Sequence, residues 1–206
     1  MDFGCGSKPY EQLFTNAQKY IGVDISSSGH NHKDSKIDVF YDGHALPFKD
    51  NYFDCIFSSE VFEHVQYLND VLPELKRVLK PGGIMMITCP FLWPEHEVPF
   101  DFRRFSSFGI KQFLQDNGFQ IITHEKLTLS SEIIFQLAIE NIRQGKLYKQ
   151  WKPLRVITQL FIFLPLTLLG LFVRVFSSNN SALYGSNLVL CSKPLHNKDI
   201  GKENND

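Results

Sequence analysis

The sequence lacks an excess of charge of either sign: 21 Lys and Arg stand against 22 Asp and Glu, which gives a formal net charge of −1. A protein that binds nucleic acid normally carries a basic excess, so nucleic acid is not an expected partner. The four cysteines form no C-x-x-C pair, and each lies in or beside an apolar run. This favours buried free thiols over disulfides, and no metal site is predicted. The first residues also lack the apolar segment of a signal peptide.

What the sequence does contain is a series of short apolar runs. Several of them lack a clean alternation of apolar and polar residues, which is typical of strands buried on both faces of a parallel sheet. The runs that we predict to be strands are 20–24, 37–41, 53–58, 83–89, 119–123 and 187–191.

Helical patterns lie between these runs. Asn69 is a candidate N-cap for a helix whose apolar residues from Val71 to Leu79 form one buried stripe. The segment 80–83, Lys-Pro-Gly-Gly, is expected to end that helix and turn the chain. A second helix is predicted over 106–117, with Gly118 as its breaker. The alternation predicts an α/β fold with a doubly wound, mostly parallel sheet.

The chain opens MDFGCGSKPY, where Gly4 and Gly6 allow a ligand to approach the backbone closely. Pro9 suits the first position of a helix, capped by Ser7 or Lys8, whose free N–H groups would bind an anion. Asp24 follows at the end of the next predicted strand, where an acid binds ribose hydroxyls in doubly wound folds. The combination indicates a nucleoside cofactor. Pro9 stands where a dinucleotide fingerprint needs its third glycine, which disfavours NAD.

Four stretches, DFGCGSKPY, GVDIS, YDGHALPFKDNYFDCIFSSEVFEHV and LKRVLKPGGIMMITCP, resemble the successive motifs of class I S-adenosylmethionine-dependent methyltransferases, and more narrowly the type 11 group. The resemblance runs from Asp2 to about Gly118, with a final strand at 187–191. It implies a Rossmann-like methyltransferase fold, S-adenosylmethionine as the cofactor and methyl transfer as the reaction. Lys8 stands where glycine is commoner, and the first strand is short. We therefore expect an upstream in-frame extension that encodes an apolar strand and a helix.

The resemblance also implies which residues hold the cofactor. The loop Gly4-Cys5-Gly6 would hold the methionine moiety, and Asp24 would bind the ribose hydroxyls. Asp42 would accept a hydrogen bond from the adenine amino group, with Gly43 and His44 beside the ring. Glu60 would lie near the sulfonium.

A dense polar stretch, WPEHEVPFDFRRF at 93–105, directly follows the predicted strand that ends at Cys89. The region beyond the carboxyl ends of parallel strands faces the ligand crevice in open α/β sheets. We therefore predict an acceptor pocket here, and a surface loop of ion pairs is the alternative. Arginines in such a pocket would hold a phosphate or carboxylate. The predicted substrate-binding residues are Glu95, Glu97, Arg103 and Arg104.

The chemistry of methyl transfer sets what else the pocket needs. A sulfonium methyl is already activated, so the protein mainly aligns the acceptor with it. A hydroxyl acceptor would also need a base, and the candidates are His96, Asp101 and His64; the alternative for His64 is packing of its turn. The pattern HExPxDxxR at 96–104 resembles stretches in methyltransferases encoded with surface-polysaccharide genes, which implies a sugar or lipid-linked glycan acceptor.

One long apolar run lies between Arg155 and Arg174, VITQLFIFLPLTLLGLFV, with Pro165 and Gly170 expected to divide it into two short helices. Its 18 residues reach the lower range of a transmembrane helix. Three interpretations stay open: an interfacial or re-entrant membrane element, a helix packed on the domain or a partner subunit, and a spanning helix. If the last β-segment belongs to the sheet, a single spanning helix would place it on the opposite side of the membrane from the rest of the sheet. The basic residues before the run, which suit an anionic membrane surface, are Lys146, Lys149, Lys152 and Arg155.

Together these patterns predict one methyltransferase domain over 1–195, with an apolar helical insert at 130–180, and a disordered polar tail at 196–206. A cytoplasmic location with peripheral contact at the inner face of the membrane through 154–176 is expected. The expected acceptor is a small molecule or a lipid-linked glycan. The alternative function is a non-catalytic, cofactor-binding or membrane-associated protein of the same fold.

Overall fold

The computed structural model describes residues 1–26, 36–129, 131–177 and 182–195, so the predicted tail at 196–206 lies outside the described residues. The chain forms two compact units. The first comprises Met1–Cys89, His96–Glu125 and Asn187–Asp206, and the second comprises Pro90–Glu95 and Lys126–Ser186. The apolar insert predicted at 130–180 makes up most of the second unit.

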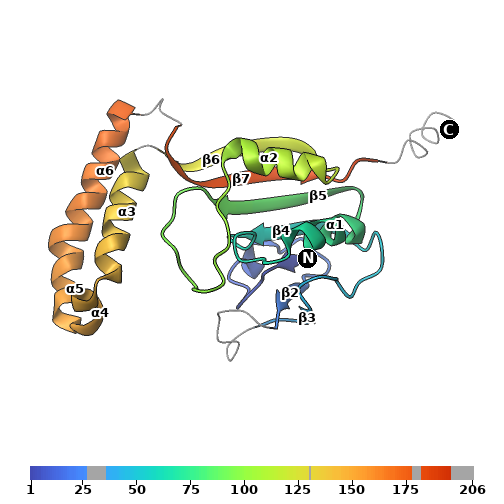
Figure 1. Ribbon diagram of the computed structural model, residues 1–206, viewed down its shortest axis with the longest axis horizontal. Helices are drawn as coiled ribbons and strands as arrows, with labels where there is room; N and C mark the ends of the chain where they lie inside the picture. Colours follow the sequence, from blue (N-terminus) through green and yellow to red (C-terminus); the bar gives the residue numbers. More distant parts are fainter. Residues whose placement is uncertain (27–35, 130, 178–181, 196–206) are drawn as a thin grey trace. The chain divides into compact units, whose positions relative to one another are not determined.

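Seven strands form one sheet in the order β3-β2-β1-β4-β5-β7-β6 (Figure 1). Strands β1 to β5 pair in parallel with their neighbours. Strand β7 runs antiparallel to β5, because Gly82 bonds to Lys193 while Cys89, further along β5, bonds to Asn187, nearer the start of β7. The mostly parallel sheet is confirmed. Its strands are β1 (Asp2–Phe3), β2 (Gly22–Ile25), β3 (Val39–Tyr41), β4 (Phe53–Ser59), β5 (Leu79–Pro90), β6 (Gln120–Leu129) and β7 (Tyr184–Ser192).

Helix α1 (Leu68–Val78) buries the predicted apolar stripe, but its ends differ from the prediction. It begins after Tyr67 rather than at Asn69. The segment 80–83 is not a turn between helix and strand, because Leu79 is already extended and pairs with Phe53 of β4. The register shifts there, so that Cys55 pairs with Ile84. The extra residues of β5 are accommodated as a bulge.

Helix α2 (Ser107–Asp116) confirms the second predicted helix. The Ser106 hydroxyl accepts a hydrogen bond from the Gly109 N–H, which is an N-cap. Gly118 has a φ of +77°, so it ends the helix in the conformation that favours glycine. Ile110 and Leu114 of this helix join the buried core of the first unit with α1 and the sheet.

The prediction of a helix that begins at Pro9 is wrong. The only helical turn there among the described residues is η1 (Glu11–Leu13), a three-residue 3-10 helix that buries none of its side chains. Lys8 has a φ of +57°, which a right-handed helix cannot use, and Leu13 is exposed to solvent. No helix N-terminus is therefore offered to a ligand at this point of the chain.

All four cysteines lie in the described part of the chain and are free, as predicted. Cys5, Cys89 and Cys191 are buried, and burial raises the pKa of Cys5 and of Cys191 to about 12. Cys55 is exposed, which corrects the expectation that every thiol is buried.

The second unit contains a helical hairpin. Helix α3 (Ser131–Gln144) and helix α6 (Leu164–Ser177) lie side by side (Figure 1) and are tied by Ser131 to the Gly170 carbonyl and by Arg174 to Glu132. In the sequence, three further elements connect α3 to α6: α4 (Lys146–Gln150), α5 (Lys152–Thr158) and a π-helical turn, η3 (Gln159–Phe163). Gly170 allows the close approach, since a Cβ there would lie 3.0 Å from the Phe135 ring.

The apolar run is not divided into two helices at Pro165 and Gly170, which corrects the prediction. Among the described residues, one helix is long and apolar enough to cross a membrane, the continuous helix Lys152–Phe176 of 25 residues. The π-helical turn ends at Phe163, two residues before Pro165, where the missing N–H interrupts the regular hydrogen-bond ladder. A local change of helix type therefore takes the place of a break.

Candidate cofactor and acceptor site

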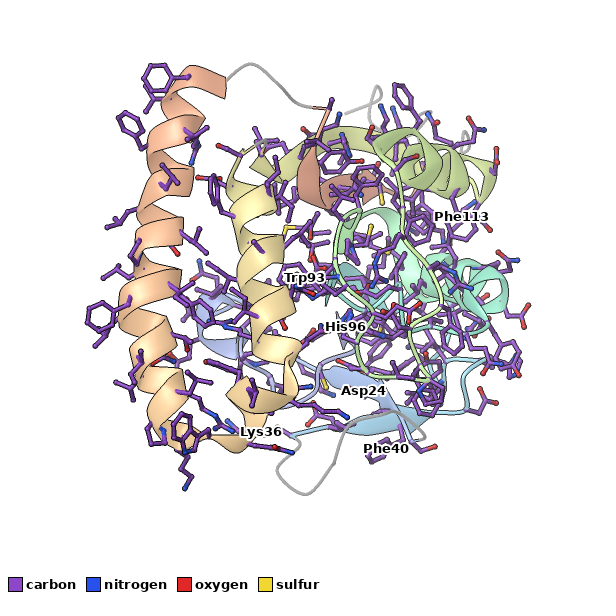
Figure 2. All side chains as sticks on the ribbon, turned by 60° about the vertical axis from the view of Figure 1, so that its left-hand side comes forward. Asp24, Lys36, Phe40, Trp93, His96 and Phe113 are labelled. Carbon is purple, nitrogen blue, oxygen red and sulfur yellow. The ribbon has the colours of Figure 1, made fainter. Side chains whose placement is uncertain are left out.

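The glycine loop is fastened to the end of β2. The N–H groups of Gly4 and Cys5 donate to the Val23 carbonyl, and the Gly6 N–H donates to Asp24 Oδ2 over 2.9 Å. Gly4 has a φ of +75°, and a Cβ there would lie 2.3 Å from the Val61 side chain, so this glycine is required by packing. Gly6 has a φ of +49°, and a Cβ there would meet no atom within 4 Å, so it borders open space beside Asp24. Asp24 can be found in Figure 2.

The buried side chain of Lys8 stabilises this loop. This side chain is 6% exposed, and its ammonium lies 2.5 Å from Asp38 Oδ2, which also accepts from the Gly22 N–H. Burial alone would raise the pKa of Asp38, but the hydrogen bonds from Lys8 and Gly22 lower it. Lys8, which stands where glycine is commoner, therefore has the positive φ that a glycine would adopt, and its charged side chain points into the protein.

The second predicted cofactor element follows β3. Asp42 Oδ1 accepts from the N–H groups of His44 and Ala45, both over 2.8 Å, and these bonds lower the pKa of Asp42. The His44 ring stacks on Tyr67 with 4.2 Å between ring centres, and its Nδ1 lies 2.9 Å from Asp70. Gly43, with a φ of +93°, packs against Ile25 of β2. The candidate ribose and adenine residues thus follow the carboxyl ends of neighbouring parallel strands.

Glu60 follows the end of β4 and has a φ of +52°. Its N–H donates to both the carbonyl and the hydroxyl of Thr88 on β5. A positive φ at a residue other than glycine costs about 1–3 kcal/mol, and such residues concentrate at functional sites. The structure therefore fixes Glu60 at the carboxyl edge of the two central strands, where its side chain is exposed.

Three candidate catalytic residues meet in the first unit. His64 Nε2 lies 3.1 Å from His96 Nε2, with the two rings nearly perpendicular. His64 Nδ1 donates to the Phe100 carbonyl, and His96 Nδ1 lies 3.2 Å from Asp101 Oδ2. Arg104 hydrogen-bonds Asp101 and lowers the pKa of that carboxyl to about 2. Each ring is thus oriented by an acceptor on its Nδ1. His96 is labelled in Figure 2.

The predicted substrate-binding residues have varied surroundings. Arg103 donates to the carbonyls of Phe62, Val65 and Gln66, so it holds the turn after β4, and burial lowers its pKa. Glu97 Oε1 lies 3.9 Å from His64 Nε2. Glu95 belongs to the second unit.

Sequence reasoning missed Glu63, the most unusual carboxyl of this site. Its side chain is 0% exposed, and neither of its oxygens has a hydrogen-bond partner among the described residues. Burial raises the pKa of Glu63 to about 8. Its Oε1 lies 3.7 Å from His64 Nε2. The available signal was the segment VFEHV, in which an acid stands between apolar residues, but such a short pattern does not distinguish a buried acid from an exposed one.

Comparison with known proteins agrees with this geometry. Residues 1–87 match the family model described as a Methyltransferase domain, of the type 11 group. An uncharacterised protein of Methanocaldococcus jannaschii is 35% identical over 115 residues, which cover 52% of this chain and 48% of the relative. The ubiquinone/menaquinone biosynthesis C-methyltransferase of Pseudomonas fluorescens is 41% identical over 46 residues, 22% of this chain and 18% of that protein. The chain thus spans about half or less of these curated relatives.

Solved structures share the fold at low sequence identity. The [4+2]-cyclase SpnF superposes with a TM-score of 0.56 at 19% identity and covers 95% of this chain and 75% of its own. An S-adenosylmethionine-dependent methyltransferase from Mesorhizobium loti gives a TM-score of 0.53 at 14% identity, and the match covers 93% of this chain and 88% of that chain. A cyclase with the same fold shows that the fold alone does not determine the reaction.

The family match covers the strands β1 to β4, helix α1 and most of β5, which carry the glycine loop, Asp24, Asp42 and Glu60. The similar solved structures, which cover 95% and 93% of this chain, extend the likeness in fold beyond these residues. Residues 1–87 therefore match the methyltransferase domain of the type 11 group, and the chain shares the fold of S-adenosylmethionine-dependent methyltransferases.

Proposed function

We propose that this chain binds S-adenosylmethionine and transfers its methyl group to an acceptor. The observation that carries the proposal is the bond between the Gly6 N–H and Asp24, which joins the open glycine position to the acid at the end of β2. Among the described residues, Asp24 Oδ1 accepts from the Ile25 N–H, and carboxylate oxygens have further lone pairs for ribose hydroxyls. The loop 4–6 would hold the methionine moiety, and Asp42 the adenine amino group.

We propose that the cluster of His64, His96 and Asp101 activates the acceptor. The reaction requires in-line approach of the acceptor to the sulfonium methyl. With a hydroxyl acceptor, the oxygen–carbon bond forms as the sulfur–carbon bond breaks, the sulfonium becomes a neutral thioether, and the hydroxyl proton must leave. Asp101 fixes the Nδ1 side of His96, which orients the ring with its Nε2 beside His64 Nε2. Glu97, Arg103 and Arg104 would shape the acceptor side.

The acceptor class is proposed to be lipid-linked, with a sugar or glycan as the methylated part. The pattern at 96–104 supports a glycan by resemblance, and a relative named for ubiquinone/menaquinone biosynthesis is consistent with a lipid-like acceptor. The second unit supports contact with a membrane. Side chains of α6 point away from α3 (Figure 2), and Phe161, Phe172 and Phe176 are each more than 60% exposed.

The proposed occupant of this apolar face is the surface of an anionic bilayer at the cytoplasmic side. Four basic residues, at 146, 149, 152 and 155, stand at the start of the apolar helix and complement anionic headgroups. The hairpin leaves strand β6 and returns to strand β7, and β7 lies within the sheet. An interfacial or re-entrant position is favoured over a single crossing, because the last strand then stays with its sheet.

The experiment that tests the function has two stages. Calorimetry with S-adenosylmethionine tests cofactor binding, and transfer of a labelled methyl group to a bacterial lipid and glycan extract tests the reaction. Binding with labelling of a lipid-linked glycan supports the proposal. Binding without labelling of any fraction would favour the non-catalytic alternative, and absence of binding would exclude both.

A further inference from the structure

We infer that Glu63, His64 and His96 form a binding site for a divalent first-row transition-metal ion of the Zn²⁺ type. The three residues belong to the first unit, and one ligand atom from each lies within 4.8 Å of the others. The site itself does not depend on the proposed methyl transfer. Its consequence for the acceptor, given below, does.

The orientation of the two histidines leaves two nitrogen lone pairs facing each other. The carbonyl of Phe100 can only accept, so His64 Nδ1 is the donor in that bond and the neutral ring has its lone pair on Nε2. His96 Nδ1 lies 3.2 Å from Asp101 Oδ2, an acceptor, so Nδ1 carries the ring proton and the neutral ring likewise has its lone pair on Nε2. Two lone pairs 3.1 Å apart repel each other unless a cation lies between them.

The distance between the two histidines matches a metal ion. With metal–nitrogen bonds of about 2.05 Å, two imidazole nitrogens lie about 2.9 Å apart at a right angle and about 3.3 Å apart at a tetrahedral angle. The observed 3.1 Å falls between these values. Glu63 Oε1, at 3.7 Å from His64 Nε2, fits a wider angle at the same ion, and Glu97 Oε1, at 3.9 Å, is close enough to become a further ligand.

The buried carboxyl is the independent observation that points to a ligand. Burying a carboxylate without a partner is costly, and both Glu63 oxygens lack one among the described residues. A proton shared by the two histidines would neutralise charge but would leave both Glu63 oxygens without a hydrogen bond from any described residue, with Oε1 3.7 Å from His64 Nε2. A metal ion bonds directly to the carboxylate. The surrounding contacts also match a metal centre, because Phe100 and Asp101 hold the outer nitrogens of the two rings.

The donor set defines the class of metal. Two imidazoles and one carboxylate suit Zn²⁺ and neighbouring first-row ions, whereas Mg²⁺ and Ca²⁺ prefer oxygen ligands only. Three protein ligands with an open position are typical of catalytic rather than structural zinc. On the proposed function, an acceptor hydroxyl would take that position and release its proton to solvent. Its oxygen would then receive the methyl group as the sulfonium becomes a thioether.

The test is equilibrium dialysis of the full chain, freed of any affinity tag and of metal, against Zn²⁺ alone, with metal counted by mass spectrometry. His30 and His32 stand two residues apart in the sequence and lie outside the described residues, so the H30Q/H32Q variant is the common background. We expect one ion per chain. H64Q, H96Q and E63Q should each weaken binding by more than about 100-fold, since loss of an outer-shell partner alone costs 10–100-fold. H124Q, which removes a histidine bonded to Asn187, is the matched control and should leave binding unchanged.

A second measurement protects the test from variants that fold poorly. Replacing Zn²⁺ by Co²⁺ in the H30Q/H32Q chain should give visible absorption bands of an ion bound by imidazole and carboxylate. Absence of stoichiometric Zn²⁺ and of these bands would overturn the inference. So would folded variants, checked by circular dichroism, that bind as tightly as the control. Neither result depends on S-adenosylmethionine or an acceptor, so failure here is distinct from failure of the proposed function.

Discussion

His64 and His96, 32 residues apart in the sequence, place their Nε2 atoms 3.1 Å from each other. His64 lies in the turn after β4, and His96 lies in the long connection after β5. Because β4 and β5 are neighbouring parallel strands, the segments that follow their carboxyl ends meet at one edge of the sheet. The fold thereby brings together the residues of the proposed acceptor side of the site.

Glu63 predicts an unusual pH dependence of stability in metal-free protein. Its pKa is raised from its ordinary value of 4.5 to about 8, so the folded state holds this proton more tightly than the unfolded state. Its contribution is present below pH 4.5 and is lost as the pH rises to 8, by at most about 4–5 kcal/mol. In EDTA, E63Q should gain in free energy of unfolding relative to the unaltered chain over this range, measured by urea titration at several pH values. If the free energies of unfolding of E63Q and of the unaltered chain differed by the same amount at all pH values, the prediction would be contradicted.

The two glycines of the loop should respond differently to alanine. Both have positive φ, which costs alanine about 1–2 kcal/mol. At Gly4 the new Cβ also meets Val61 at 2.3 Å, and overpacking adds about 1–3 kcal/mol. G4A should therefore unfold at clearly lower urea than G6A. G6A should instead lose affinity for S-adenosylmethionine, because its Cβ enters the space proposed for the methionine moiety. Equal stability of the two variants would refute the assigned roles.

Lys8 and Asp38 form a pair that K8M would break. The variant leaves Asp38 half-exposed, so we expect a loss of about 1–2 kcal/mol, below the 3–5 kcal/mol typical of a fully buried pair. The lowered pKa of Asp38 means that its contribution is present above its unfolded pKa and is lost as the pH falls through the folded one. The difference between K8M and the unaltered chain should shrink in acid. D38N is the companion variant, and a difference that persists in acid would indicate packing instead.

The exposed apolar helix predicts binding to anionic vesicles. Flotation with phosphatidylglycerol vesicles should recover the protein, and F161S/F172S should reduce recovery. F108S is the matched control, because Phe108 is equally exposed but lies on α2 of the first unit. K146Q/K149Q/K152Q should shift binding to higher anionic lipid content. Recovery that is unchanged in every variant, or a stable dimer in place of vesicle binding, would reject the membrane proposal.

The sequence predicted the sheet and both crossover helices because their apolar patterns are long enough to be unambiguous. The apolar stripe of α1 and the Gly118 ending of α2 are local properties. The prediction of a helix after Pro9 was wrong because of the backbone at Lys8. Lys8 has a positive φ, and its side chain bonds to Asp38, which lies 30 residues away in the sequence. Glu63 could not be recognised either, since its burial results from tertiary packing. Candidate cofactor residues were easier to name because they lie in motifs that resemble those of a known family.

Calorimetric titration of the full chain with S-adenosylmethionine tests the central claim most directly, with D24A as the comparison. We predict one site per chain and at least about a tenfold loss of affinity in D24A, because hydrogen bonds to a charged group contribute about 1.5–3 kcal/mol. D24A should remain folded by circular dichroism. No binding by the unaltered chain, or equal binding by folded D24A, would contradict the assignment of the glycine loop and Asp24 as the cofactor site.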